Sequence, residues 1–202
     1  DGEIIGLVAI QDVPKSSSKD AIAELKARGL MTVMLTGDNK RVAQAIADEV
    51  GIDRVIAEVM PNDKAQQIKE LQDKGKKVAF VGDGINDAPA LSTADVGIAM
   101  GSGTDIAIDS GGIVLVRNDL RGVVRALDIS KKTFNRIKLN LFWALIYNVI
   151  GIPIAAGLFA FVGFTLSPEL AGLAMAFSSV SVVSSSLLLN KTKIAGDHVV
   201  QA

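Results

Sequence analysis

The hydrophobic positions of this chain follow one pattern up to about residue 138 and another beyond it. Through residue 118, short apolar runs alternate with segments whose apolar positions recur at helical spacing. Most of the short runs are continuous rather than alternating, which is typical of parallel strands buried on both faces. The strand candidates are Ile4–Ile10, Met31–Leu35, Arg54–Ala57, Lys77–Val81, Val96–Ala99 and Ile113–Val116, and the helix candidates are 17–28, 39–49, 61–73, 86–93 and 104–110.

This alternation predicts an α/β domain over residues 1–118, with an open, mostly parallel sheet and helices on both faces. Several helix ends carry recognisable signals. Asp38 can cap the helix 39–49 and Gly51 can end it, Pro61 suits a first helical turn, and Gly75 follows the last turn of 61–73. Ligands in such sheets bind at the carboxyl ends of the strands, so polar residues that follow strands are the candidates for function.

The second pattern indicates a membrane-spanning region. Between Leu139 and Asn190 the ionisable side chains are Glu169 and the Tyr147 phenol. Two apolar runs, about 139–164 and 170–189, are each long enough to cross a hydrocarbon core of roughly 30 Å at about 1.5 Å per residue. A buried helical hairpin of a large soluble protein is the alternative, and two adjacent runs of this length argue against it.

Basic residues flank the apolar runs and predict their orientation. Residues 119–138 form a predicted basic helix, and Lys191 and Lys193 follow the second run, whereas the turn 165–169 has no Lys or Arg. Positive residues at both outer ends place both ends in the cytosol, so we expect a multi-pass membrane protein. The predicted division is therefore 1–118 and 119–202.

The overall composition excludes some classes of function. The net charge of −1 gives no strong attraction to nucleic acid, and the absence of cysteine excludes disulfides and thiolate metal sites in this stretch. The chain starts at Asp1 without a signal peptide or an initiator Met. We expect it to be part of a longer protein.

Two polar turns suggest that the α/β domain binds phosphate. In Thr36-Gly37-Asp38-Asn39, Gly37 permits a tight turn, and the Thr36 hydroxyl with nearby amides could hold a phosphoryl oxygen. Lys64 lies in a predicted first helical turn, where the helix dipole disfavours a cation unless an anion is near. Taken alone, each feature is better explained by its plain interpretation, a turn capped by Asp38 and a solvated lysine.

The run from Gly82 to Pro89 carries a more specific signal. Asp83, Asn86 and Asp87 lie within one stretch of five residues, 83–87, which follows the strand candidate Lys77–Val81. Mg²⁺ takes hard oxygen ligands, often one or two carboxylates together with phosphate oxygens. Asp83 is the best candidate ligand, while Asn86 and Asp87 could order the metal's waters or the neighbouring loop. Hydroxyl, cation and metal carboxylate together favour phosphoryl transfer, which works by positioning and charge neutralisation.

Taken together, these residues resemble the phosphorylation domain of P-type ATPases, in the haloacid-dehalogenase-like superfamily. The resemblance implies ATP as substrate and Asp83 as a ligand of the catalytic Mg²⁺. It also implies that Lys64, Thr36 and Gly37 contact the phosphoryl group, with Asp38 in the same turn and with Asn86 and Asp87 supporting the site. The family's phosphorylated Asp, in an Asp-Lys-Thr-Gly-Thr motif, has no counterpart here and would lie upstream.

The apolar runs carry polar residues that suggest a transported ion. Tyr147 and Asn148 lie within the first run, and Met175 and Ser179, four residues apart, share a face of the second. A thioether favours Cu(I), although Met and Ser also serve helix packing. The segments resemble the last two helices of copper(I)-transporting P-type ATPases, which implies that these four residues belong to a Cu(I) path.

This resemblance has limits that affect the ion path. Ser185 stands where that family usually has Asn, and Gly111-Gly112 replaces a usual Ala-Asp pair. The same residues do not separate Ag(I) from Cu(I). The partners implied are ATP, copper(I), a lipid membrane, the upstream part of the pump and, as a candidate, a copper chaperone.

The favoured function is ATP-driven export of Cu(I) or Ag(I) through a phospho-aspartate intermediate. A membrane-anchored phosphatase of the haloacid-dehalogenase superfamily is the alternative, since it would share the phosphate site. A non-catalytic membrane scaffold is a third hypothesis, and the intact Gly82–Pro89 run argues against it.

Overall fold

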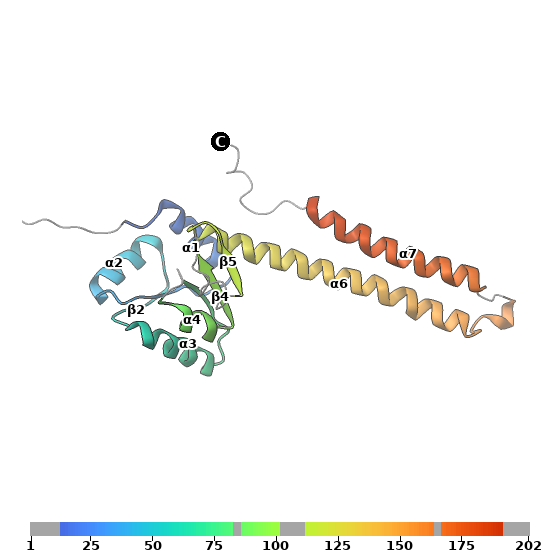
Figure 1. Ribbon diagram of the computed structural model, residues 1–202, viewed down its shortest axis with the longest axis horizontal. Coiled ribbons are helices and arrows are strands. Elements are labelled where there is room, and N and C mark those ends of the chain that lie inside the picture. Colours follow the sequence, from blue (N-terminus) through green and yellow to red (C-terminus); the bar gives the residue numbers. More distant parts are fainter. Residues whose placement is uncertain (1–12, 83–85, 102–111, 164–166, 192–202) are drawn as a thin grey trace, which may run out of the picture. The chain divides into compact units, whose positions relative to one another are not determined.

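The computed structural model describes residues 13–82, 86–101, 112–163 and 167–191, and the chain divides into two compact units, Asp1–Val124 and Arg125–Ala202. The first unit alternates helices and strands, as Figure 1 shows. Its elements are α1 (Ser16–Ala27), β1 (Val33–Leu35), α2 (Lys40–Val50), β2 (Arg54–Ile56), a 3₁₀ turn at Pro61–Asp63, α3 (Lys64–Asp73), β3 (Ala79–Gly82), α4 (Ala88–Thr93), β4 (Val96–Met100) and β5 (Ile113–Leu115).

The described strands pair in parallel, which confirms that part of the sequence prediction. β1 pairs with β2, and β3, β4 and β5 form a second ladder in that order. In the second ladder Phe80 lies opposite Gly97, and Ala99 lies opposite Val114. The predicted strand Ile4–Ile10 and the predicted helix 104–110 lie outside the described residues. Parallel pairing aligns the carboxyl ends of β3, β4 and β5 along one edge.

Small and branched side chains form the core between the helices and these strands. Ala43 and Ala47 of α2 are fully buried, and α4 buries Leu91 against Ala99 of β4 and the half-buried Phe80 of β3. Ile68 supplies the buried position of α3. Burying a large aliphatic side chain contributes roughly 1.5–3 kcal/mol, so these contacts hold α3 and α4 against the strands that end at the site.

The start of α2 differs from the sequence prediction. The predicted cap was Asp38, but the N-cap is Asn39, whose Oδ1 accepts a hydrogen bond from Val42 N at 3.0 Å. The Asp38 carboxylate instead accepts from the Thr36 hydroxyl, and this commits it to the turn before the helix. The other end is as expected, because Gly51 ends α2 with a φ of 83°, which favours glycine.

The second unit consists mainly of two helices, α6 (Arg121–Ala155) and α7 (Pro168–Leu187), which lie side by side in Figure 1. α6 starts at the end of the first unit and joins the predicted basic helix to the first apolar run without a break. Hydrogen bonds link the two helices: Arg136 Nη1 donates to Ser185 Oγ (3.1 Å), and Asn140 Nδ2 donates to Ser186 Oγ (2.9 Å).

The first predicted membrane segment, 139–164, extends too far. α6 ends at Ala155, because Gly157 adopts a φ of 89° and the chain turns back on itself. Leu158 N donates to Pro153 O (3.0 Å) and Gly157 N to Ile154 O (3.0 Å), a pairing that closes helix ends. The end of the helix therefore follows from Pro153 and Gly157. A pattern of hydrophobic positions alone does not take such residues into account.

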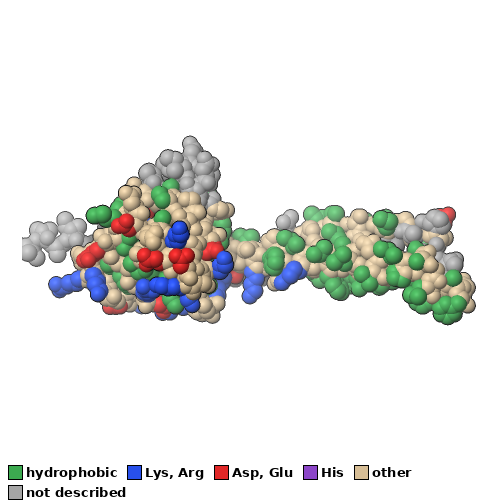
Figure 2. All heavy atoms as spheres, turned by 90° about the horizontal axis from the view of Figure 1, so that it is seen from below, with side chains coloured by type: hydrophobic (Ala, Val, Ile, Leu, Met, Phe, Trp, Pro, Cys, Tyr) green, Lys and Arg blue, Asp and Glu red, His purple; other side chains and the backbone are tan. Residues whose placement is uncertain are grey.

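By length and composition, α6 is the described helix that can cross a membrane. The apolar stretch of α7 covers Met175–Leu187 and is shorter than a helix that crosses a membrane needs to be. The second predicted span, 170–189, therefore remains a proposal. Figure 2 shows hydrophobic side chains spread over the helical pair, with Lys and Arg side chains gathered along one part of it.

Candidate functional site

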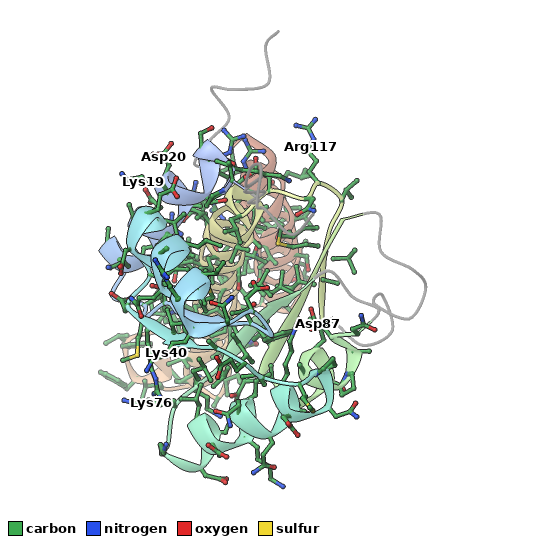
Figure 3. All side chains as sticks on the ribbon, turned by 90° about the vertical axis from the view of Figure 1, so that its left-hand side faces the viewer. Lys19, Asp20, Lys40, Lys76, Asp87 and Arg117 are labelled. Atoms are coloured by element: carbon green, nitrogen blue, oxygen red, sulfur yellow. The ribbon has the colours of Figure 1, made fainter. Side chains whose placement is uncertain are left out.

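The centre of the candidate site is an ion pair between α3 and the start of α4. Lys64 Nζ lies 2.7 Å from Asp87 Oδ1, and the two side chains are only 19% and 10% exposed. Asp87 lies where β3 has ended and α4 begins (Figure 3), and its carbonyl accepts from Leu91 N at 2.8 Å. The solvated-lysine interpretation of Lys64 is therefore wrong. The anion that offsets the helix dipole at Lys64 is the Asp87 carboxylate.

Gly82, the last residue of β3, gives this carboxylate its place. A Cβ atom at Gly82 would lie 2.6 Å from Asp87 Oδ2 and 3.0 Å from both Asp87 Cβ and Phe80 Cε1. No side chain fits in this space, so the backbone of β3 and the carboxylate are in direct contact. Glycine is required here for close approach rather than for an unusual backbone angle.

The turn after β1 is held by its own side chains. The Thr36 hydroxyl donates to Asp38 Oδ2 (2.9 Å) and accepts from Asp38 N (3.1 Å). Gly37 lies close to the neighbouring backbone, since a Cβ there would be 3.3 Å from Val59 O. The turn is thus held by contacts within this chain, with the hydroxyl and backbone at the carboxyl end of a strand.

A short stretch after β2 links this turn to the ion pair. Val59 N donates to Thr36 O (3.1 Å), and Glu58 N donates to Asp38 O (2.9 Å). Lys64 lies five residues beyond Val59, so the chain between them spans at most about 18 Å. The Thr36 turn is therefore joined to Lys64 by a short stretch of chain, while the ladders β1–β2 and β3–β4–β5 pair separately.

The linking stretch was not predicted from the sequence. Glu58 has a φ of 59°, which is uncommon for a residue with a side chain, and its carboxylate lies 3.5 Å from Lys40 N. Nothing in the residues around Glu58 signals this conformation in advance. It arises because the carbonyls of Thr36 and Asp38 need donors, and the amides of Val59 and Glu58 provide them.

Two predicted residues of the Gly82–Pro89 run contribute differently from Asp87. Asn86 is exposed just before α4, which starts at Ala88 rather than at the predicted residue 86. The predicted Mg²⁺ ligand Asp83 lies outside the described residues. Among the residues that are described, no three His, Cys, Asp or Glu side chains form a metal-binding group.

Other paired carboxylates of this unit hold the strands at their amino ends. Asp95, just before β4, lies 2.7 Å from Lys77 Nζ and also accepts from Val78 N and Gln72 Nε2, and these contacts hold the pKa of its carboxyl well below the usual value. Asp53, just before β2, pairs with Lys26 at 2.7 Å and accepts two hydrogen bonds from Thr32, which lowers its pKa to about 2. We assign these two a structural role.

The predicted ion-path residues lie on the two long helices and bond locally. Asn148 Nδ2 donates to Ala144 O (2.9 Å), and the Ser179 hydroxyl donates to Met175 O (3.4 Å), so each contacts its own helix. The Met175 side chain is 70% exposed and that of Tyr147 is 38% exposed in this chain. Met175 and Ser179 share a face of α7, as predicted, but no hydrogen bond in the described part of the chain joins these four residues across the helices.

Comparison with known proteins identifies relatives of this chain. Residues 1–95 match the haloacid dehalogenase-like hydrolase family. The chain is 58% identical over 189 residues to a probable copper-exporting P-type ATPase of Archaeoglobus fulgidus, an alignment that covers 93% of this chain and 23% of that protein. It is 53% identical over 189 residues to human copper-transporting ATPase 2, covering 94% of this chain and 13% of that protein.

A solved structure agrees with these relatives. The crystal structure of a zinc-transporting PIB-type ATPase in its E2.Pi state matches with a TM-score of 0.77 and 39% identity, over 89% of this chain and 28% of that one. The chain thus spans about a quarter or less of the length of the curated relatives it matches. At this level of similarity, across both the α/β unit and the helices that follow it, the chain belongs to the P-type ATPase family, in the branch that includes the copper-transporting members.

Proposed function

We propose that the protein to which this chain belongs uses ATP to export Cu(I), or Ag(I), across a membrane through a phospho-aspartate intermediate. The observation that carries the proposal is the Lys64–Asp87 ion pair, shielded from solvent at the carboxyl end of β3. The same chain holds a helix long and apolar enough to cross a membrane. The names of the relatives add copper as the transported ion.

In this proposal the α/β unit binds the phosphoryl group with groups that are already in place. Lys64 offsets the negative charge of the phosphoryl oxygens, and the Gly37 amide donates a hydrogen bond to them. The Thr36 hydroxyl, whose single proton lies on Asp38 Oδ2 at 2.9 Å, contacts the phosphoryl group by turning that proton toward it. Donors that need no rearrangement stabilise developing charge most effectively, which suits phosphoryl transfer. The proposal requires an accepting aspartate that is not among the residues assigned above.

The donor chemistry of the site fits a magnesium ion. Carboxylate oxygens are the ligands that Mg²⁺ prefers, and the site provides the Asp87 carboxylate, whose Oδ1 pairs with Lys64 and whose Oδ2 lies beside the backbone of Gly82. Asp83 and Asp87 are the residues we propose to hold the ion, with the exposed Asn86 ordering its waters. When bound, Mg²⁺ neutralises charge on the phosphoryl oxygens.

For transport, we propose that Tyr147, Asn148, Met175 and Ser179 line a Cu(I) path, with the soft thioether of Met175 as the selective ligand. The path requires α7 as the second membrane-spanning segment and the upstream helices of the pump. Basic residues at both outer ends of the hairpin favour cytosolic ends, with the turn outside. A copper chaperone is the proposed donor of the ion.

The proposal is tested on the full-length pump reconstituted in vesicles. Asp87→Asn should lower Cu(I)-stimulated ATP hydrolysis by about 100-fold or more, because it removes charge from the site that positions the phosphoryl group. Met175→Leu should lower Cu(I) stimulation while basal hydrolysis persists. The matched control is Met31→Leu, which changes another exposed methionine in the α/β unit. Normal Cu(I) activation in Met175→Leu would overturn the ion path.

A membrane-anchored phosphatase is the second candidate, favoured by the match of residues 1–95 to a hydrolase family. It predicts hydrolysis of small phosphate esters without copper and no copper movement. Measuring Cu(I) accumulation in sealed vesicles with and without ATP separates the two. ATP-dependent accumulation supports the pump, and its absence together with phosphatase activity supports the alternative.

A further inference from the structure

The arginine at the contact between α6 and α7 is held by neutral groups. Arg136 is half-buried, and its Nη1 donates to the Ser185 hydroxyl at 3.1 Å. One turn further along α6, Asn140 Nδ2 donates to Ser186 Oγ (2.9 Å), and that hydroxyl in turn donates to Val182 O (2.9 Å). These hydroxyl and amide contacts orient the guanidinium between the helices, but they do not neutralise its charge.

The described part of the hairpin places no carboxylate within reach of this charge. The nearest acid along α6 is Asp128, eight residues before Arg136, or about 12 Å at the helical rise. On α7 the acid is Glu169, sixteen residues before Ser185, or about 24 Å. A half-buried charge without a counter-ion is costly, so an anion from outside the described hairpin is expected to complete the site.

We infer that Arg136, with Ser185, binds the phosphodiester of an anionic phospholipid at the cytosolic end of the hairpin. A guanidinium offers five donors in a planar fork that matches phosphate oxygens, and Ser185 takes one of them. Exposed apolar side chains follow directly on α6, among them Leu141 and Phe142, where acyl chains would lie. Basic pockets between membrane helices on the cytosolic side bind such headgroups. The inference rests on the proposed function, since it requires this hairpin to span a bilayer.

The test measures lipid binding by the full-length protein in phosphatidylcholine nanodiscs that contain spin-labelled phosphatidylglycerol. The readout is the preference of the immobilised lipid fraction for phosphatidylglycerol over phosphatidylcholine. Arg136→Gln should lower this preference about fivefold, and Arg136→Lys, which keeps the charge but not the fork, should lower it about twofold. The matched control is Lys131→Gln, an exposed cation about 140° around the helix, which should leave the preference nearly unchanged.

Each outcome decides the inference. An unchanged preference in Arg136→Gln overturns it and favours a carboxylate from another part of the protein as the counter-ion. An equal loss in Lys131→Gln also overturns it, in favour of diffuse surface charge. Displacement of the labelled lipid by millimolar inorganic phosphate would indicate a small-anion site instead. If Arg136→Gln does not fold, Arg136→Lys and Ser185→Ala decide, since both keep the positive charge and each should bind more weakly. The measurement needs neither ATP nor copper, so failure of the lipid-binding inference can be distinguished from failure of the pump proposal.

Discussion

The ion pairs of the α/β unit join different elements, whereas the polar side chains along the predicted ion path bond within their own helix. In the α/β unit the important partners are far apart in sequence, as in Lys64 with Asp87 and Lys77 with Asp95. In the helical unit, Asn148, Ser179 and Ser181 donate to carbonyls of their own helix, three or four residues away. Cross-element pairing preorganises a catalytic site, whereas a locally bonded hydroxyl or amide can change partner without disturbing the fold. Predictions that separate the two modes follow, from the largest effect to the smallest.

Breaking the Lys64–Asp87 pair should have the largest effect on stability. Removing one partner leaves a nearly buried charge without compensation, which costs about 3–5 kcal/mol. Lys64→Met and Asp87→Leu should each show this loss in denaturant unfolding of the full protein, monitored in the α/β unit. The double variant should lose much less than the sum of the two. Additive losses would mean that the two side chains do not interact.

Gly82→Ala should destabilise the same unit by about 1–3 kcal/mol, the range for overpacking. The added methyl group would collide with the Asp87 carboxylate and with Phe80. The free energy of unfolding and the rate of ATP hydrolysis should therefore both fall. The matched control is Gly112→Ala, because a Cβ there meets no atom within 4 Å. Equal behaviour of the two variants would contradict the close contact at Gly82.

The Asp53 cluster predicts a pH dependence of stability. The pKa of Asp53 is lowered to about 2 in the folded protein by Lys26 and Thr32, from an ordinary value near 3.8. A depressed pKa stabilises the fold above the unfolded-state value, and this contribution is lost as pH falls from about 4 to about 2. The gap in Tm between wild type and Asp53→Asn should therefore be constant above pH 5 and narrow below pH 4. A difference in Tm that stays constant down to pH 2 would contradict the lowered pKa of Asp53.

The smallest effect should come from the hairpin. Asn140→Ala removes a hydrogen bond between helices, a bond worth about 0.6 kcal/mol on average in membranes. Asn148→Ala removes a bond within one helix and should change stability less, although we propose that it impairs copper transport. Steric-trapping measurements of unfolding in bilayers can compare the stability losses of Asn140→Ala and Asn148→Ala. A larger loss of stability for Asn148→Ala would reverse the contrast drawn above.

Predictions from the sequence succeeded where the signal is local. Continuous apolar runs predicted parallel strands, and Gly51 and Gly75 adopt positive φ at the ends of α2 and α3. Errors arose where a neighbouring interaction decides the outcome. Asn39 rather than Asp38 caps α2, because the Asp38 carboxylate accepts a hydrogen bond from the Thr36 hydroxyl. The apolar run to residue 164 was interrupted by the Pro153–Gly157 helix end.

The sequence by itself determined the classes of element, the candidate chemistry of the Gly82–Pro89 run and the apolar character of α6, because these depend on spacing and residue type along a short stretch. Only the tertiary structure decided that Asp87 is the partner of Lys64 and that Gly82 must lack a side chain. It also decided that Val59 locks the Thr36 turn and that Arg136 lies against Ser185. These contacts join residues five to forty-nine positions apart, and such pairings depend on how the elements pack rather than on local preference.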